Sequence, residues 1–360
     1  MDFQLSEELR DLQALARTIF TDLATTERIR EVEVTETRVD DPLWEQLGRA
    51  GLLGLALPEA HGGAGLGLDA VCVVLEEQGR HVAPVPLWPA TVAALVLARH
   101  GAPDRQAELL PGCAEGTRRL TLALEEYDGR PPAEPACQAE HTEGGWELTG
   151  TKAVVPSPAG ASHVLVSAAT DDGPGLFLVA NEGLEWELAD TTSLERAGTL
   201  RLAGTPAERV GGAEAVRDAL RWAALALAAV QVGVADGAMR LAAAYTSGRE
   251  QFGRPLGSFQ AVQHQLADCW IDVEAMRVTL WQGLSSDTDR AALVARWWCG
   301  QAGLDVVHRV QHVHGGIGVD VDYPVHRFFL WGKQVASTLG GPEAALADLG
   351  ELLAEGDVLA

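Results

Sequence analysis

The sequence has few basic residues for its length. Its 360 residues include 27 Lys and Arg against 51 Asp and Glu, which gives a net charge of −24. Nucleic-acid binding needs clusters of Lys and Arg that neutralise phosphates, and anionic membrane surfaces attract the same residues. The charge balance therefore argues against both kinds of partner. It does not exclude a small polyanionic ligand, because a few local cations can hold a pyrophosphate.

Paired cysteines and long apolar runs are also missing. The five Cys are scattered with no CxxC pair, and this odd count without metal-ligand spacing predicts reduced, mostly buried thiols in a cytosolic protein. Residues 1–4 lead directly into an amphipathic helix pattern, so we expect no signal peptide. The most apolar run, residues 222–234, is too short to span a bilayer. We therefore expect a cytoplasmic protein without membrane insertion.

Apolar spacing predicts three modules in the order helical, β, helical. Leu5, Leu9, Leu12, Leu15 and Ile19 recur at helix spacing, and Trp44 to Leu53 continue the pattern. Further helices are predicted at about 69–80 and after Pro89. Strands are predicted at 120–124, 146–155, 164–166 and 176–179, with turns such as 171–174 between them. Long helices follow at 213–247, 258–284, 288–314 and about 342–355. The predicted domain boundaries are 1–118, 119–212 and 213–360.

Four motifs follow one another along the chain, at residues 51–67, 148–152, 245–264 and 312–327. The last two contain the strings REQFGRPLGSFQ and HVHGGIG, and then DYPVHR. In these motifs the sequence resembles the acyl-CoA dehydrogenase family over nearly its whole length. The resemblance implies an α+β fold with an N-terminal helical domain, a small middle β-barrel or sandwich and a C-terminal four-helix bundle. It also implies an FAD-dependent enzyme that oxidises an acyl-CoA substrate.

The segment around Arg249 has a physical reading of its own. Arg249 follows a helix that ends at Gly248, and Phe252 comes three residues later. Arg offers a planar fork for a pyrophosphate, and Phe offers a flat face for adenine. The alternative is a surface turn with a salt bridge between helices. The resemblance implies that Arg249, Gln251 and Phe252 reach across a subunit interface to the ADP half of FAD.

The resemblance adds two groups of cofactor-binding candidates. The first group follows the Arg249 turn and consists of Leu256, Phe259 and Val262. The second is the glycine-rich loop with His312, Gly315 and Gly316, where small residues let a phosphate or ribose approach backbone N–H groups. A lone GGxG pattern is usually only a turn. His308, His312, His314 and His326 have no carboxylate at ligand spacing, so we expect no metal.

The middle β module departs from the family pattern. Lys152 follows a turn, where a lysine is most often solvated, and we treat it as a marker of the fold rather than a catalyst. Relatives usually carry Thr-Glu-Pro and then Ala-Gly-Ser-Asp in the stretch that here spans residues 124–132. They carry Trp-Ile-Thr where this chain has Val154-Val155-Pro156. The flavin-ring half of the site is therefore eroded, whereas the ADP half is kept.

The family's catalytic base is missing as well. The reaction needs a carboxylate that removes the α-proton of the thioester while hydride leaves to the flavin. The usual Glu position holds Leu339 or Gly340, depending on a one-residue choice of alignment, and the alternative position holds Ala223. Only two weak candidates remain, Glu343 and Asp236. We expect Glu343 in the first turn of a helix, where it favours the helix dipole.

With these departures, the chain resembles one subunit of the heterotetrameric bacterial acyl-CoA dehydrogenases that act on steroid side chains. We therefore expect an α₂β₂ complex in which a second acyl-CoA dehydrogenase-like chain carries the base and electron-transfer flavoprotein accepts the electrons. A self-sufficient homomeric flavoenzyme with an unusual base remains an alternative. A third hypothesis is a non-catalytic scaffold that has lost flavin, against which the retained Arg249 and Phe252 speak.

Overall fold

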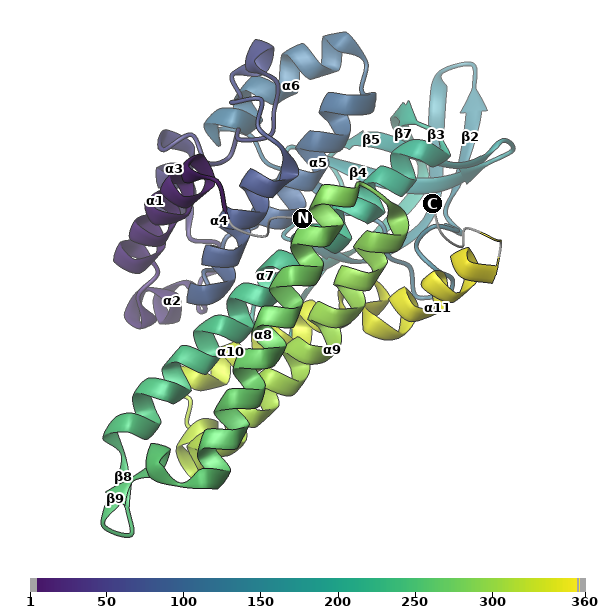
Figure 1. The fold of residues 1–360 in the computed structure, drawn as a ribbon. Coiled ribbons are helices and arrows are strands. Elements are labelled where there is room, and N and C mark those ends of the chain that lie inside the picture. The colour runs from purple at the N-terminus through teal and green to yellow at the C-terminus, as the bar shows by residue number, and fades with distance from the viewer. Residues whose placement is uncertain (1–4, 355, 357–360) are drawn as a thin grey trace. The chain divides into compact units, whose positions relative to one another are not determined.

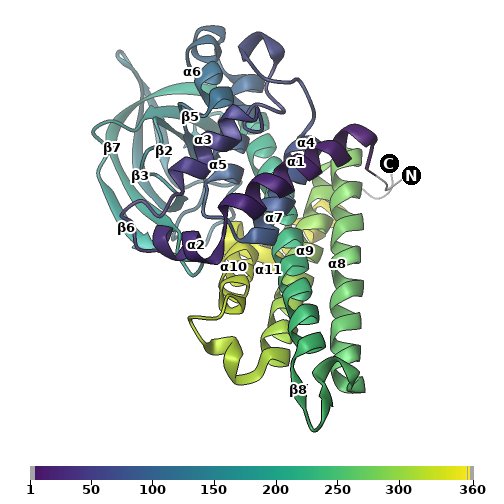
Figure 2. The same ribbon diagram turned by 90° about the vertical axis from the view of Figure 1, so that its left-hand side faces the viewer.

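The computed structural model describes residues 5–354 and 356, and these pack into two compact units (Figures 1 and 2). One unit, called the helical unit below, comprises the described parts of 1–28, 72–83 and 224–360. The other, called the β unit, comprises 29–71 and 84–223. Helices α4 (Leu68–His81), α2 (Thr26–Val32) and α7 (Ala213–Gly248) each continue from one unit into the other. The three domain boundaries expected from the sequence stay a prediction.

The β unit is built on a closed sheet. Its strands are β1 (Leu120–Ala123), β2 (Gln138–Thr142), β3 (Gly145–Pro156), β4 (His163–Thr170), β5 (Gly173–Ala180), β6 (Trp186–Asp190) and β7 (Arg196–Gly211). They pair in the order β1-β4-β2-β3-β7-β5, and an additional β4–β5 pairing closes β4, β2, β3, β7 and β5 into a ring. Helices α3 (Asp41–Arg49), α5 (Leu87–His100) and α6 (Pro103–Glu115) and the short η1 (Glu59–His61) belong to the same unit.

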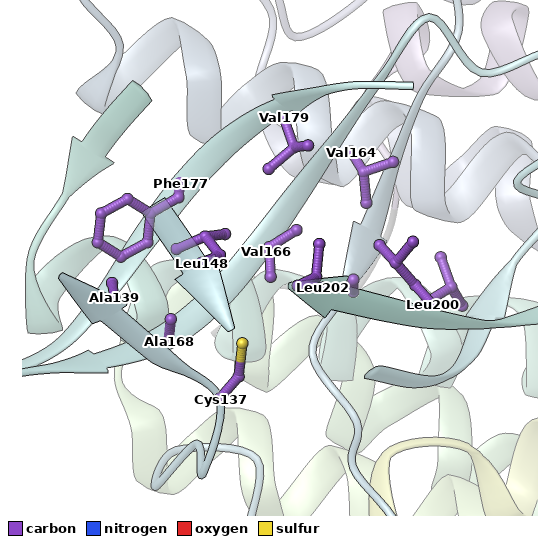
Figure 3. Packing of buried hydrophobic residues seen from close by; sticks show 12 residues of the cluster. Cys137, Ala139, Leu148, Val164, Val166, Ala168, Phe177, Val179, Leu200 and Leu202 are labelled. Atoms are coloured by element: carbon purple, nitrogen blue, oxygen red, sulfur yellow. The ribbon is translucent and has the colours of Figure 1, made fainter. Parts of the chain in front are cut away.

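Alternating apolar residues fill the inside of this barrel. Figure 3 shows Leu148 of β3, Val166 of β4 and Phe177 of β5 pointing toward one another between the strands, and all three side chains are fully buried. Strand residues alternate between the two faces of a sheet, so each strand sends every second side chain inward. The middle β-barrel expected from the family resemblance is present.

The helical unit is dominated by the long helices α7, α8 (Gln260–Ser286) and α9 (Asp289–His314), which run side by side in Figures 1 and 2. It also contains α1 (Glu7–Leu23), α10 (Val325–Ser337) and α11 (Gly341–Ala354), with the short elements β8 (Glu250–Gln251), β9 (Arg254–Pro255), η2 (Leu256–Ser258), η3 (Gly315–Val319) and η4 (Thr338–Gly340). Gly79 and Gly233 let α4 and α7 approach closely, because an added Cβ on either would collide with a backbone carbonyl of the other helix.

A charged network crosses this unit where α4, α7 and α8 meet. Arg80 of α4 pairs with Glu76 and Glu77 of its own helix and with Asp236 of α7, and Arg277 of α8 also pairs with Glu76. The side chains of Glu77 and Asp236 are 0% and 1% exposed. Buried charges are tolerated when paired and hydrogen-bonded, so the network ties three helices to one another.

Most of the long elements confirm the prediction within a few residues. The helices expected at 213–247, 258–284 and 288–314 are α7, α8 and α9, and the strands expected at 146–155 and 176–179 are β3 and β5. All five cysteines are free and buried, as expected. The expectation for residue 4 and for the end of the last helix at residue 355 lies outside the described residues.

Several elements differ from the prediction. Leu52 and Leu53 do not continue a helix, because α3 ends at Arg49 and Gly51 takes a φ of 74°. Gly173 and Pro174 begin β5 rather than forming only a turn. The helix placed after Pro89 begins at Leu87, since proline fits the first turn of a helix. Strands β2, β6 and β7 and helix α10 were not predicted, because their polar or mixed sequences carry no clear apolar period.

Helix α7 contains the apolar run expected at 222–234 and extends beyond it on both sides. Its 36 residues pass the test of length and hydropathy for a membrane span. Of its most apolar 18-residue window, however, 89% is buried inside the protein. This window is therefore core, and the apolar character of α7 is explained by packing.

Candidate functional site

The Arg249 segment forms a two-residue hairpin at the end of α7. Glu250 pairs with Pro255 and Gln251 with Arg254, which leaves Phe252 and Gly253 as the two turn residues. Both have positive φ, 55° and 77°, as the turns that join short hairpins require. A bulky residue rarely adopts this conformation, and a strained backbone retained at one position points to a function there.

Two polar side chains of this hairpin, Arg249 and Gln251, have no hydrogen bond or ion pair to another element among the described residues. Phe252 is 92% exposed, and Figure 1 shows the β8–β9 hairpin standing free at the end of the bundle. Over residues 5–354 and 356, the Arg249 side chain forms no hydrogen bond or ion pair. Gln251 donates from Nε2 only to the neighbouring Glu250 carbonyl, at 2.7 Å. The alternative interpretation of this segment is a surface turn with a salt bridge between helices. The described part of the chain contains no such salt bridge from Arg249.

Phe259 sits next to this hairpin at the start of α8. The Arg254 guanidinium lies 4.0 Å from the centre of the Phe259 ring, and Phe252 approaches that ring edge-on with the centroids 6.1 Å apart. A cation over a ring face and an edge-to-face aromatic pair are both favourable. Leu256 and Val262 are half-buried. The structure therefore groups Phe252 and Phe259, and it adds Arg254, which the sequence analysis did not single out.

The glycine-rich loop is the 3₁₀ turn η3 directly after α9. Gly315 has a φ of 60°, and an added Cβ on Gly315 or Gly316 would meet no atom within 4 Å. The turn therefore offers open space beside backbone N–H groups. His312 is exposed, whereas the preceding Gln311 donates from Nε2 to the Gly318 carbonyl at 2.5 Å and braces the turn from within.

His314 connects this turn to the hairpin. Its ring is 4% exposed and stacks on Tyr245 with centroids 4.6 Å apart, and Nδ1 lies 2.8 Å from the Val310 carbonyl. His308 instead packs against Phe329, and His326 Nδ1 faces the Tyr323 carbonyl. Within the described ranges no three His, Cys, Asp or Glu side chains form a group that could hold a metal.

Lys152 corrects the expectation of a solvated lysine. It is fully buried in the β unit, where its Nζ contacts Glu126 at 2.5 Å and Ser167 Oγ at 3.0 Å. Glu126 in turn accepts the backbone N–H groups of Ala136 and Cys137, at 2.7 and 3.1 Å. Burial lowers the pKa of Lys152, and the hydrogen bond and charge of Glu126 oppose that effect. The pair closes the loop 126–137, which overlaps the stretch 124–132 where the sequence departs from the family pattern.

Asp236 and Glu343, the two weak candidates for a base, have different surroundings. Asp236 is buried between Arg80, at 2.5 Å, and Arg240, at 2.8 Å. Burial by itself would raise the pKa of Asp236, but the hydrogen bond from Arg240 and the charge of Arg80 outweigh it and lower that pKa. Glu343 is exposed in the first turn of α11. A paired carboxylate with a lowered pKa is poorly suited to take a proton at neutral pH.

The loop before α11 holds Leu339 in a left-handed conformation, with φ 53° and ψ 45°, followed by Gly340 and Gly341 with φ of 79° and 68°. Arg296, 3% exposed, donates to the carbonyls of Val335, Ala336 and Thr338 and fixes the approach to this loop. Ala223 is fully buried in α7. None of Leu339, Gly340 and Ala223 carries a group that exchanges protons.

Comparison with known proteins gives the same family for both ends of the chain. Residues 6–117 match the family model described as "Acyl-CoA dehydrogenase, N-terminal domain", and residues 211–350 match "Acyl-CoA dehydrogenase, C-terminal domain". The acyl-CoA dehydrogenase FadE27 of Mycobacterium tuberculosis is 39% identical over 99% of each chain. The chain belongs to the acyl-CoA dehydrogenase family.

Two solved structures are similar to this acyl-CoA dehydrogenase over almost its full length. A chain of the Tcur3481–Tcur3483 steroid acyl-CoA dehydrogenase G363A variant is 60% identical, with a TM-score of 0.95 over 98% of this chain and 99% of that one. A chain of the ChsE4–ChsE5 complex from Mycobacterium tuberculosis is 39% identical, with a TM-score of 0.93 over 99% of both chains. The N-terminal helices, middle β-barrel and C-terminal helices expected from the sequence are therefore confirmed.

Acyl-CoA dehydrogenases depend on FAD, and the residues described above fit part of that cofactor. Arg249 offers a free fork for a diphosphate, Phe252 an exposed ring for adenine, and Gly316 open space beside its backbone, whereas the Gly315 N–H already donates to the His312 carbonyl. These groups suit the ADP half of a dinucleotide.

Proposed function

We propose that this acyl-CoA dehydrogenase is one subunit of a heteromeric enzyme, in which it contributes the ADP half of the FAD site and a partner chain supplies the catalytic base. The main support for this proposal is the β8–β9 hairpin. Phe252 in its turn is 92% exposed, and the Arg249 side chain forms no hydrogen bond or ion pair among the described residues. A hairpin that leaves a strained phenylalanine almost fully exposed, with only Phe259 as an aromatic neighbour among the described residues, suits a ligand bound partly by another subunit.

The residues at the two positions where relatives carry the catalytic base support the proposal that the partner chain supplies that base. The reaction removes a proton from the α-carbon and a hydride from the β-carbon of an acyl thioester, so it needs a carboxylate near that α-carbon. FAD, when bound, supplies the acceptor for the hydride. Leu339, Gly340 and Ala223 cannot take the proton. In our proposal Arg249 binds the diphosphate, Phe252 covers the adenine, and Gly316 lets the cofactor approach the backbone, while the Gly315 N–H stays bonded to the His312 carbonyl.

The likeness to chains whose structures carry the names of two proteins supports a second acyl-CoA dehydrogenase-like partner. We propose that the two chains form an α₂β₂ assembly. The surface of α8 fits such a partner, since Trp270 is 55%, Ile271 62% and Val278 41% exposed. Exposed apolar groups of this kind on a helix mark interaction sites. The substrate is a bulky acyl-CoA of the steroid side-chain type, as the similarity to a steroid acyl-CoA dehydrogenase suggests. Electron-transfer flavoprotein accepts the electrons, and the complex is cytoplasmic.

The experiment that tests the proposal compares the chain expressed alone with the complex recovered from its own cells through a tag on this chain. We expect the lone chain to contain little FAD and to have no acyl-CoA dehydrogenase activity. The complex should contain a second, acyl-CoA dehydrogenase-like chain, bound FAD and activity. Arg249→Ala should lower the FAD content of the complex. A yellow, active homo-oligomer of the lone chain would refute the proposal.

The two other hypotheses have distinct outcomes in the same preparations. A homomeric enzyme with an unusual base would be active alone and would lose activity in Glu343→Gln or Asp236→Asn while it kept its FAD. The arginine partners of Asp236 argue against this role for that residue. A scaffold that has lost flavin would contain no FAD in any complex, and Arg249→Ala would then have no effect.

A further inference from the structure

Three aromatic rings from three separate segments form a closed cluster at the end of the helical unit. His314 is the last residue of α9, Tyr245 lies near the end of α7, and Tyr323 lies in the loop before α10. The ring centroids are 4.6 Å apart for Tyr245–His314, 5.4 Å for His314–Tyr323 and 6.1 Å for Tyr245–Tyr323. The first pair is stacked at 21°, and such separations are those of favourable aromatic pairs.

His314 is fixed within this cluster. With Nδ1 at 2.8 Å from the Val310 carbonyl, Nδ1–H donates, and Nε2 is then the unprotonated nitrogen. Nε2 is buried and has no hydrogen-bond partner among the described residues. Burial lowers the pKa of His314, with the Val310 hydrogen bond opposing it, so the ring is neutral at physiological pH. Among the described residues the ring therefore has one hydrogen bond, to Val310, and two aromatic neighbours, Tyr245 and Tyr323.

Two residues of the cluster, Tyr245 and His314, lie directly beside the two candidate cofactor segments, the hairpin and the η3 turn. The Arg249 N–H donates to the Tyr245 carbonyl at 2.8 Å, and Leu256 N–H donates to the Arg249 carbonyl at 2.8 Å, so Tyr245 anchors the base of the hairpin. His314 directly precedes Gly315, whose positive φ starts the η3 turn. Across the described residues, no hydrogen bond or ion pair joins 249–255 to 315–319. The stacked rings therefore link the bases of the two segments.

We propose that the Tyr245–His314–Tyr323 cluster is a positioning element of the cofactor site, which fixes the Arg249 hairpin relative to the Gly315–Gly316 turn so that both reach the diphosphate half of one FAD. This inference rests on the function proposed above. His314 acts through Arg249 and the turn and does not touch the cofactor itself. Preorganised segments bind a ligand more tightly because less freedom is lost on binding.

Two substitutions of His314 separate stacking from the hydrogen bond. His314→Asn keeps a side-chain N–H donor but removes the ring, and His314→Phe keeps the ring but removes the donor. The measurement is the Kd for FAD of the complex purified from the host cells, stripped of FAD and titrated with it by fluorescence. We expect His314→Asn to raise the Kd about three- to tenfold, in line with the strength of one or two aromatic pairs. His314→Phe should recover most of the wild-type affinity.

A double variant tests whether His314 acts through Arg249. If it does, the loss of affinity in Arg249→Ala/His314→Asn is smaller than the product of the two single losses, because the stack has no arginine left to position. The urea midpoint and the assembly of each complex are recorded beside the Kd. A merely structural role would make the Kd follow the midpoint, with His314→Phe no better than His314→Asn, and would overturn the inference.

The outcomes also distinguish this inference from the function on which it rests. If Arg249→Ala weakens FAD binding and His314→Asn does not, the inference fails and the proposed function stands. If the wild-type complex holds no FAD, the proposed function fails and the inference with it. Should His314→Asn not assemble, Tyr323→Leu removes the third ring without altering α9, and the same increase in Kd is expected. An unchanged Kd in assembled Tyr323→Leu would then overturn the inference.

Discussion

Lys152 and Glu126 form a buried ion pair that joins strand β3 to the loop 126–137. The side chains are 0% and 7% exposed, and Glu126 also holds the backbone of Ala136 and Cys137. The lysine that the sequence marks only as a feature of the fold is thus the central contact of that loop.

Removing one partner of this pair should destabilise the protein strongly. Glu126→Gln or Lys152→Met leaves an uncompensated buried charge, so we expect a loss of about 3–5 kcal/mol in the free energy of unfolding. The double variant should lose less than the sum of the two. Urea unfolding of all three variants measures this. Glu187→Gln is the control, since the Arg201–Glu187 pair on the same sheet is 78% and 74% exposed and should matter little. Equal effects of Glu126→Gln and Glu187→Gln would contradict the prediction.

Phe252 should show a trade-off between stability and cofactor binding. Its φ of 55° is unfavourable for a bulky side chain and suits Asn, so Phe252→Asn should leave stability unchanged or raise it by up to about 1 kcal/mol. The same change removes the exposed ring and should lower FAD content in the assembled complex. Thermal unfolding and flavin absorbance give the two readings. A variant that loses stability and keeps its FAD would show that the Phe252 ring stabilises the hairpin and does not bind the cofactor.

Asp236→Asn should act on stability rather than on the chemical step. The change removes one of the three carboxylates that pair with Arg80, whereas Glu76 and Glu77 remain, so we expect a loss of about 1–3 kcal/mol. Because the pKa of Asp236 is lowered in the folded chain, its stabilising effect is present above the unfolded value of about 3.8 and is lost as the pH falls through the folded pKa. Urea unfolding between pH 3 and 7 tests this. Normal stability with lost activity would make Asp236 a catalytic base.

The burial of His314 gives the stability a defined dependence on pH. Its folded pKa is lowered, so below about pH 6.5 the unfolded chain binds a proton that the folded chain does not. The free energy of unfolding therefore falls as the pH decreases from about 7 to 5. His314→Phe should show a smaller fall, while His81 and His163, whose pKa values are also lowered by burial, contribute equally to both proteins. Identical pH profiles would contradict a buried neutral imidazole.

Two glycines in helices should respond oppositely to alanine. A Cβ on Gly79 would collide with the Val230 carbonyl of α7, so Gly79→Ala forces α4 and α7 apart and should cost about 1–3 kcal/mol. Gly350 of α11 has open space around it, and Gly350→Ala should stabilise the chain by up to about 1 kcal/mol. Thermal unfolding of both variants checks the signs. A neutral Gly79→Ala would mean that the two helices can separate without cost.

The sequence predicted the long helices and several strands because their apolar residues repeat at the period of one element. It could not reveal β7 or α10. In β7 many side chains are exposed and polar, and pairing with β3, β5 and β6 defines the strand. Of the site, the motifs identified Arg249, Phe252 and the glycine turn. They did not identify Arg254, because its contact with Phe259 depends on the hairpin folding back onto α8.

The sequence by itself determined the family and the absence of a carboxylate at Leu339, Gly340 and Ala223, and it supplied the residues that we propose bind ADP, since each depends only on which residue occupies a position. Tertiary structure decided which charges are buried and which rings meet. Lys152 is buried by a loop 26 residues away in sequence, and His314 meets Tyr245 across 69 residues. Contacts over such separations are set by packing of whole elements, and no local pattern of residues encodes them.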